Sequence, residues 1–385
     1  MPYFDHNATT PLLPQAREAW LAVADEAWQN PSSPYRSAAR AHRLLEENRA
    51  KLAALLEAPP ESIVFNSGAS EGNNSVLAWA ASALPSDRCA WVSPTEHPSM
   101  LEAARAQFPG SRLRSIEVDA SGRIDLAELA AALRRERAGL VAAMAANNET
   151  GVLGDAPAIA ALCREHGAWM ICDASQWIGK LPRARLPRNV FLIGCAHKFG
   201  GPKGAGFVCL PPGAEGFRGI RGGEHEHGHR AGTENVASIA AMVAALVYSE
   251  NHDNDDRRVR EDWRDTCAAG VMAAVPGAFV HGVGAPRLWN TFSLCLPAHE
   301  NTRWVARLDR AGFEVSTGSA CATGSDAPSH VLAAMGVSAA QARRTIRISS
   351  GWTTTRDDWT ALAAAIGAVW RELEAEGSGS AVIEV

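Results

Sequence analysis

Short apolar runs alternate with helix-like segments through the middle of the chain. The runs at 62–68, 89–97, 139–151, 168–175, 189–198 and 204–211 are continuous rather than alternating, and each ends in polar or turn residues. Continuous apolar runs are typical of strands that are buried on both faces of a mostly parallel sheet. The segments "SEGNNSVLAWAASAL" and "PSMLEAARAQF" between them are expected to be helices. The pattern therefore predicts an α/β fold.

Polar side chains stand where these predicted strands end. They are Ser67, His97, Asn148, Asp173 and the pair His197–Lys198. In such folds, ligands bind at the carboxyl ends of the strands. The sequence therefore predicts one site that is assembled from five separate strand ends.

The pattern changes near Asp255, where a charged segment, "DNDDRRVREDWRD", begins. The later segments "HGVGAPRLWNTFSLCLP" and "RRTIRISSGWTTT" indicate a smaller α+β domain. A chain of 385 residues is long enough for two domains. We predict a large domain at 14–255 and a small domain formed by 1–13 together with 256–385.

Composition and charge narrow the choice of function class. Hydrophobic residues make up 46% of the chain, the net charge is -5 and the pI is near 6.2. A mildly acidic chain has no electrostatic reason to bind nucleic acid or an anionic membrane. The N-terminal segment is too polar for a signal peptide, and no apolar run approaches the length of a membrane-spanning helix. The eight cysteines form no CxxC pair, so we expect a reduced, cytoplasmic protein.

Lys198 and Asp173 each allow two interpretations. Lys198 follows an apolar run and enters the glycine-rich "GGPKG", where it is either a solvated loop residue or the residue that holds a cofactor as an imine. Asp173 is either a cap or Asx-turn residue, or the partner of a cationic pyridinium nitrogen. Gln176, three residues later, could then donate to the ring hydroxyl.

The segment "NSGASEGNN" lies between a predicted strand and a predicted helix. Ala69 and Ser70 either present backbone N–H groups to a phosphate, or Ser70 is a plain N-cap. His97 is either a turn residue or lies flat on an aromatic cofactor ring. Asn148 could equally be a turn residue.

Cys321 differs from the other cysteines because Ser, Thr, Gly and Ala surround it. A thiol on such a loop is either exposed and reactive or an incidental surface cysteine. Arg347 stands alone in the apolar alternation "TIRISSG". It would hold a substrate carboxylate in a bidentate contact or form a structural ion pair.

A metal site is the less favoured interpretation of "GGEHEHGHRAGTEN". His225, His227 and His229 would share one face of a strand, as zinc ligands could. The glycines within the segment instead favour a flexible loop, so we expect no metal.

Seven motifs in a fixed order resemble the cysteine desulfurases, pyridoxal 5'-phosphate (PLP) enzymes of the class V aminotransferase group. The motifs are "SGASEGNN", "TEHPS", "NNETG", "CDASQ", "AHKFGGPKG", "RAGTEN" and "STGSAC". The resemblance runs from "YFDHNATTP" to "IRISSG" and is to the subgroup that serves nitrogenase and general iron–sulfur assembly. It implies a PLP-dependent transferase of fold type I, with a large domain and a smaller α+β domain.

The resemblance also implies a role for each candidate residue. Lys198 would bind PLP as an imine, Asp173 would face the ring nitrogen, Gln176 the ring hydroxyl, and His97 would stack on the ring with Asn148 beside it. Ala69, Ser70 and His197 would hold the phosphate, and Thr233 would reach it from the other subunit of a homodimer. Arg347 would bind the carboxylate of L-cysteine, and Cys321 would take the sulfur as a persulfide.

Three positions depart from the family pattern. Cys195 stands where relatives usually have a phosphate-binding serine, and a thiol is a weaker donor. Ser70 replaces a frequent threonine, and His227 replaces a common arginine.

Three alternative functions stay open. The protein could be a selenocysteine lyase or an aminotransferase of the same fold, or a non-catalytic sulfur-carrier scaffold. The protein that accepts the sulfur is not specified by the resemblance.

Overall fold

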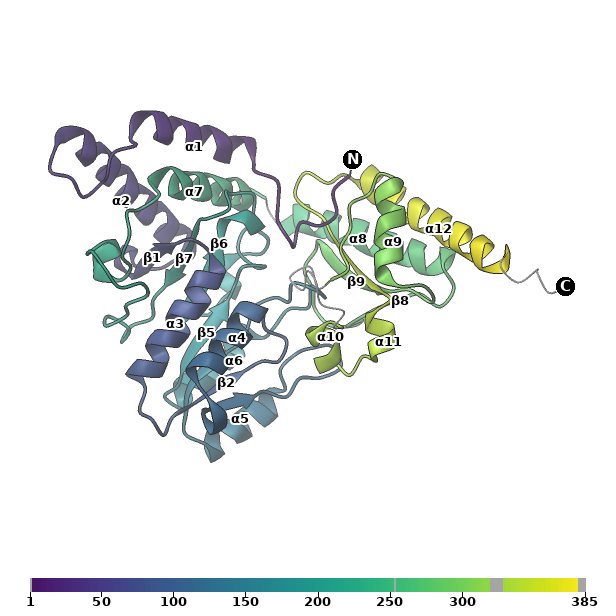
Figure 1. Cartoon of the computed structure of the whole chain (residues 1–385), viewed down its shortest axis with the longest axis horizontal. Coiled ribbons are helices and arrows are strands. Elements are labelled where there is room, and N and C mark those ends of the chain that lie inside the picture. The colour runs from purple at the N-terminus through teal and green to yellow at the C-terminus, as the bar shows by residue number, and fades with distance from the viewer. Residues whose placement is uncertain (1, 253, 319–327, 380–385) are drawn as a thin grey trace.

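The fold is built on two sheets that lie side by side (Figure 1). The computed structural model describes residues 2–252, 254–318 and 328–379. The larger sheet has the strand order β1-β7-β6-β5-β4-β2-β3. Its strands are β1 (Ile63–Asn66), β2 (Cys89–Val92), β3 (Leu113–Ser115), β4 (Ala138–Ala142), β5 (Trp169–Asp173), β6 (Phe191–Cys195) and β7 (Gly206–Cys209). Only β7 runs against its neighbours β1 and β6, so the predicted, mostly parallel sheet is confirmed.

Helices cover both faces of this sheet. One face packs against α1 (Pro14–Glu26), α2 (Arg36–Leu56), α5 (Leu126–Arg135), α6 (Ala156–Glu165) and α7 (Val236–Glu250). The other face packs against α3 (Ala69–Ala83) and α4 (Pro98–Gln107). Successive residues of one strand enter opposite cores: Leu192 of β6 enters the first, and Phe191 and Ile193 enter the second. Burial on both faces explains why these strands are continuous apolar runs.

The smaller sheet is antiparallel, with the order β10-β9-β8, and has a core of its own. Its strands are β8 (Phe279–Val280), β9 (Thr291–Cys295) and β10 (Thr345–Ser349), and its helices are α8 (Asn254–Ala274), α9 (Asn301–Arg310) and α12 (Arg356–Gly379). The short helices α10 (His330–Ala334) and α11 (Ala339–Ala342) form a separate small cluster. The predicted boundary at 255/256 falls in the first turn of α8, and the exact domain limits stay a prediction.

The N-terminal arm, residues 2–13, connects the two sheets (Figure 1, purple). Tyr3 and Asp5 form parallel bridges with Glu314 and Ser349 of the small domain. Farther along, the backbone N–H groups of Thr10 and Leu13 donate to the carbonyls of His197 and Gly200 in the large domain. The arm therefore passes directly over the carboxyl end of β6.

Gly351 gives the arm room to pack. A Cβ atom at this position would lie 2.2 Å from Cε1 of the buried His6 ring. We predict that Gly351→Ala lowers the free energy of unfolding by about 1–3 kcal/mol, because the ring or the arm must shift. Gly216→Ala is the matched control, since a Cβ atom there meets nothing within 4 Å. Denaturant titration measures both variants, and equal stability losses would contradict the packing argument.

Candidate active site

A cavity of about 780 Å³ opens at the carboxyl ends of the large-domain strands, where the sequence predicts the site. Its wall also includes Asn7, Ala8 and Thr9 of the arm. Ten of the predicted site residues line it: Ala69, Ser70, His97, Asn148, Asp173, Gln176, Cys195, His197, Lys198 and Arg347. The structure thus brings together side chains from five strand ends of the large domain and from β10 of the small one.

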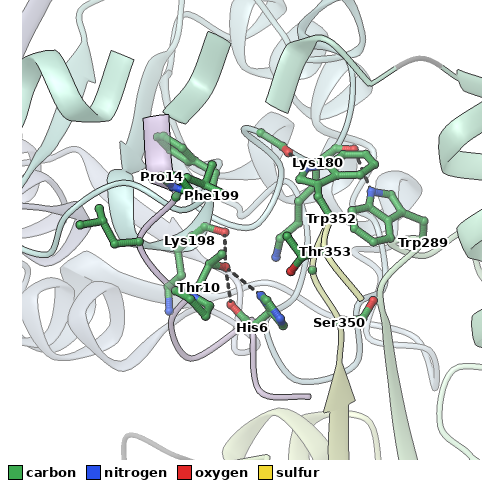
Figure 2. Close-up of a pocket in the computed structure, with 15 residues that line it drawn as sticks. His6, Thr10, Pro14, Lys180, Lys198, Phe199, Trp289, Ser350, Trp352 and Thr353 are labelled. Atoms are coloured by element: carbon green, nitrogen blue, oxygen red, sulfur yellow. Dashed lines mark hydrogen bonds between the residues drawn. The ribbon is translucent and has the colours of Figure 1, made fainter. Parts of the chain in front are cut away.

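The arm holds the amine of Lys198. Lys198 lies in the single 3₁₀ turn that follows β6, residues Ala196–Lys198. Its Nζ donates to the backbone carbonyls of Asn7, at 2.7 Å, and Ala8, at 2.9 Å. Thr10 Oγ1 donates to the Lys198 carbonyl at 3.2 Å (Figure 2). Contacts at both ends of the residue therefore fix Lys198 at the cavity wall.

Asp173 is the buried last residue of β5. Its Oδ1 accepts from the backbone N–H of Ser175 at 2.9 Å, and its Oδ2 accepts from Asn73 Nδ2 at 3.1 Å. Asn73 Oδ1 and Ser175 Oγ are buried and have no hydrogen-bond partner. A buried carboxylate with these donors suits a cationic ring nitrogen, because a positive charge would offset the cost of burying the negative one.

The first turn of α3 offers an anion site. The N-cap of α3 is Gly68, with φ +144°, and no side chain caps the helix. The interpretation of Ser70 as a plain N-cap is therefore wrong. The positive end of the helix dipole at Ala69 and Ser70 adjoins the cavity and suits a phosphate. The nearby Glu71 carboxylate is paired with Arg230 at 2.9 Å, which neutralises its charge.

Two neutral imidazoles line the cavity. His97 is the N-cap of α4, and its Nδ1 accepts from the backbone N–H of Ser99 at 3.2 Å. Burial lowers the pKa of His97 despite the opposing charge of Asp173. Burial, together with the charge of Lys198, lowers the pKa of His197 to about 4. His97 thus combines the expected turn role with a place at the cavity, and neither ring adds a positive charge at neutral pH.

Cys195 ends β6 at the same wall as Ala69 and Lys198. Its side chain is buried, and burial raises the pKa of the thiol. The thiol therefore stays protonated at neutral pH and can offer a phosphate only a weak S–H donor.

Arg347 forms a structural ion pair, which is one of its two interpretations, and it also lies at the cavity. Its side chain is 2% exposed and its NH2 group forms an ion pair with Asp5 Oδ1 at 2.5 Å. Its NH1 group donates to the carbonyls of Asn148 and Gly318, at 3.2 Å each. The guanidinium also lines the cavity, and its Nε atom is buried without a partner. A carboxylate in the cavity could therefore still bind this group.

Thr233 lies outside the main cavity of its own chain. It lines a second cavity of about 160 Å³, with Phe65, Glu226 and Arg230 among its neighbours. That cavity adjoins Ser67 and Gly204, which also line the main one. Thr233 is thus near the expected phosphate end but separated from it.

The three histidines of the glycine-rich loop point to different partners. His225 pairs with Glu234 at 2.9 Å, His229 contacts the Phe217 carbonyl at 2.9 Å, and His227 lies 3.9 Å from Glu46. No group of three or more metal-ligating side chains occurs in the described part of the chain.

None of the helices in the described part of the chain has the length and apolarity needed to cross a membrane.

Cys321 lies outside the described residues. The nearest described residues on its two sides that contact the site are Gly318 and His330, and both line the main cavity. His330 Nε2 lies 2.8 Å from the Glu96 carbonyl. Described residues on both sides of Cys321 thus line the cavity.

Sequence reasoning missed the contribution of the arm. Asn7 and Ala8 act through their backbone carbonyls, so their side chains carry no signal of this role. Asp5 and Asn7 do stand in the polar run "DHNATT" near the N-terminus, and this run was the one sequence feature that indicated a role for the arm in the site. Lys180 and Glu96 were missed because their local sequence does not show that their side chains are buried.

Comparisons with known proteins agree with this geometry. A family model, "Aminotransferase class-V", matches residues 2–362. A cysteine desulfurase of Klebsiella pneumoniae is 38% identical over 350 residues, which is 90% of this chain and 87% of the relative. The solved structure of a NifS-like protein superposes with a TM-score of 0.86 at 28% identity, covering 96% of this chain and 99% of the other. The structure of SspA in complex with cysteine gives a TM-score of 0.79 at 27% identity, covering 92% and 100%.

The fold and the lysine at the cavity wall define a PLP-dependent transferase of fold type I. The chain belongs to the aminotransferase class-V family, whose cofactor is PLP. The residues present fit this cofactor: a lysine amine, a buried carboxylate and an uncapped helix terminus all meet in one cavity.

Glu96 gives the site a testable pH dependence. Its carboxyl group is fully buried, and burial, followed by the charge of Asp173, raises its pKa well above the ordinary value. Oε1 accepts from the backbone N–H of Met144, whereas Oε2 is buried without a partner. The folded state thus favours the protonated form. Its contribution to stability is present below the unfolded-state pKa, near 4.3, and is lost as pH rises through the folded-state pKa.

We predict that Glu96→Gln becomes progressively more stable than the wild type between pH 5 and pH 8, because the amide cannot lose a proton. The gain is about 1.4 kcal/mol for each unit by which the folded-state pKa is raised. Chemical denaturation at several pH values measures it, with the exposed Glu61→Gln as the control. A stability difference that does not change with pH would show that Glu96 is not protonated on folding.

Proposed function

We propose that this protein is a PLP-dependent cysteine desulfurase that removes sulfur from L-cysteine, releases L-alanine and keeps the sulfur as a persulfide on Cys321. The observation that carries the proposal is the single cavity in which Lys198, Asp173, His97 and Arg347 meet. The similarity to cysteine desulfurases over most of the chain supports the same reaction.

The cavity divides into places for the parts of the cofactor. Lys198 would hold it covalently, Asp173 would pair with the ring nitrogen, and Gln176 would donate to the ring hydroxyl. The phosphate would lie at the start of α3, held by Ala69 and Ser70 with His197 and Cys195 near it. Once bound, PLP supplies an electron-withdrawing ring that makes the Cα proton of an amino acid acidic.

The remaining residues act on the substrate. Arg347 would bind the cysteine carboxylate, with Asn148 at its side. Asp5 holds the NH2 group in this structure, so the carboxylate would bind the guanidinium where it lines the cavity or would replace Asp5. The Lys198 amine, held by two backbone carbonyls, would take the proton from Cα. His97 is neutral and can pack flat against the ring.

Cys321 would complete the reaction on sulfur. Its thiolate attacks the substrate sulfur, an S–S bond forms, and the Cβ–S bond breaks with its electron pair passing to Cβ, which takes a proton. The sum of the step is L-cysteine plus enzyme thiol giving L-alanine plus enzyme persulfide. The positions of Gly318 and His330 support this role, because these described residues on either side of Cys321 both line the cavity.

The proposal extends to partners and location. The persulfide would pass to a protein acceptor, either an iron–sulfur cluster scaffold or another sulfur carrier. A cytoplasmic location fits the seven described cysteines, which are all buried free thiols and suit a reducing compartment. Nucleic acid and membrane are not expected partners.

The central test separates the two halves of the mechanism. We predict that Cys321→Ser binds PLP normally and changes its absorbance spectrum when L-cysteine is added, because these steps use Lys198, Asp173 and Arg347. Alanine production should fall at least 100-fold, because serine lacks a soft, low-pKa nucleophile. Cys267→Ser, at a buried thiol in the small-domain core, is the matched control. The measurements are absorbance, alanine release, and mass spectrometry of the wild-type peptide that contains Cys321.

Near-normal alanine release by Cys321→Ser, or sulfur found on Cys195, would refute the assignment of Cys321. A selenocysteine lyase would instead favour selenocysteine over cysteine. An aminotransferase would require a 2-oxo acid, and a non-catalytic scaffold would show no cofactor absorbance.

Substitution of Thr233 tests whether the protein is a homodimer with shared sites. We propose a homodimer in which Thr233 donates to the phosphate in the partner's site, since it lies outside its own. Thr233→Ala should weaken PLP binding about tenfold, the usual cost of one lost hydrogen bond to a charged group. Co-expression of Thr233→Ala with Lys198→Ala subunits should restore one site of wild-type affinity, because the intact Lys198 and Thr233 meet in the mixed dimer. A fully active monomer, or no restoration in the mixed dimer, would contradict the proposal.

A further inference from the structure

Lys180 is a fully buried lysine with no role in the reaction described above. It follows β5 in the segment "SQWIGKLP" and is 4% exposed. Its Nζ donates to Asn7 Oδ1 at 2.8 Å and to Gln176 Oε1 at 2.5 Å. Across the described ranges, no carboxylate oxygen lies within 4 Å of this amine. Burial, with the charges of Lys198 and Arg347, lowers the pKa of Lys180 well below its ordinary value.

A buried lysine without a carboxylate partner is costly, so its position needs a physical reason. Figure 2 shows Lys180 and Lys198 flanking the pocket in which His6 and Thr10 of the arm lie. The carbonyl of Lys180 accepts from the indole N–H of Trp289 at 2.9 Å and from Arg257 Nε at 3.0 Å. The backbone contacts attach this segment to the small domain, but they do not require an amine at the end of the side chain.

The amine determines which way the amide of Gln176 faces. Gln176 Nε2 donates to the Asn7 carbonyl at 2.9 Å, and a carbonyl can only accept. The oxygen end of the same amide therefore needs a donor, and Lys180 provides it, whether as an ammonium or as a neutral amine. The second hydrogen of Gln176 Nε2 is then left for a group in the cavity, which Gln176 lines.

The same amine contacts Asn7, whose Oδ1 also accepts from Asn290 Nδ2 at 3.3 Å. Since Asn7 Oδ1 accepts from Lys180, its Nδ2 faces Thr291 Oγ1 at 2.9 Å and the Asn148 carbonyl at 3.1 Å. The backbone carbonyl of Asn7 is also the acceptor for Lys198 Nζ at 2.7 Å. One buried amine thus contacts the oxygen atoms of two amides, and the nitrogen of one of them, Gln176, donates to the carbonyl that also holds Lys198.

We infer that Lys180 is a positioning residue that orients the amide of Gln176 so that its NH2 group donates to the ring oxygen of the cofactor. The inference rests on the proposed function, because it assigns the cavity to PLP and the ring hydroxyl to Gln176. Without the Lys180 donor, Gln176 Oε1 would be buried and unpaired, and the amide would turn or leave its place.

A double-mutant cycle of Lys180→Met and Gln176→Ala tests the inference. Methionine is one atom shorter, keeps an unbranched apolar stem and removes the donor. The readouts are the dissociation constant of PLP for the apoenzyme, measured by fluorescence quenching, and the absorbance maximum of the bound cofactor. Lys180→Met should weaken PLP binding about tenfold and shift the absorbance. In the Gln176→Ala background, the same substitution should change neither quantity, since Lys180 acts through that amide.

Trp289→Phe is the matched control, because it removes a hydrogen bond to the Lys180 carbonyl and leaves the amine in place. It should lower the melting temperature of the apoenzyme and leave the absorbance maximum unchanged. If Lys180→Met does not fold, Lys180→Gln replaces it in the cycle. Glutamine is one bond shorter than lysine but still a donor, so we expect a smaller loss of PLP affinity.

The inference would be overturned if the Lys180 substitution changed PLP affinity and absorbance equally in the wild-type and Gln176→Ala backgrounds, because Lys180 would then have a structural role alone. An unchanged absorbance maximum in the single variant would overturn it as well. These failures differ from a failure of the proposed function, in which the wild-type protein itself would not bind PLP or release alanine from cysteine.

Discussion

The site depends on two amines, buried Lys180 and half-buried Lys198, that lie beside one stretch of N-terminal backbone. Lys198 and Lys180 both donate to Asn7, one to its carbonyl and the other to its side chain. A buried amine must be satisfied by acceptors, and here the acceptors come from a segment that also bridges both sheets. Correct placement of the arm is therefore a condition for the cavity, because the arm supplies part of its wall and orients its central lysine.

Charge in the cavity is balanced by separate pairs. Asp5 pairs with Arg347 and Glu71 pairs with Arg230, while Asp173 is held by neutral donors. Asp173, whose backbone and amide donors are neutral, is the carboxylate that we assign to a cationic ring nitrogen. His97 and His197 are neutral because burial lowers their pKa values. In our proposal, the phosphate lies at the start of α3 and the substrate carboxylate at Arg347.

The sequence predicted the large sheet well, because strands buried on both faces leave continuous apolar runs and their polar ends mark one edge. It also gathered ten cavity residues correctly, from Ala69 to Arg347. It did not predict the ion pair of Arg347 with Asp5, since residues 342 positions apart in the chain meet only in the fold. The role of Asn7 and Ala8 was out of reach for another reason: backbone carbonyls are the same in every residue. The burial of Lys180 follows from contacts with the arm and the small domain, which no local pattern carries.

The claim that Lys198 is the cofactor-bearing residue is central to this account, and it can be tested by chemical trapping. The holoenzyme would be reduced with borohydride, digested and analysed by mass spectrometry for a phosphopyridoxyl group on lysine. Three lysines are informative, since Lys203 also lines the main cavity and Lys180 lies behind the arm. The account predicts that the label is found on the peptide at Lys198 and that neither of the others is modified. A label on Lys180 or Lys203, with Lys198 unmodified, would contradict it.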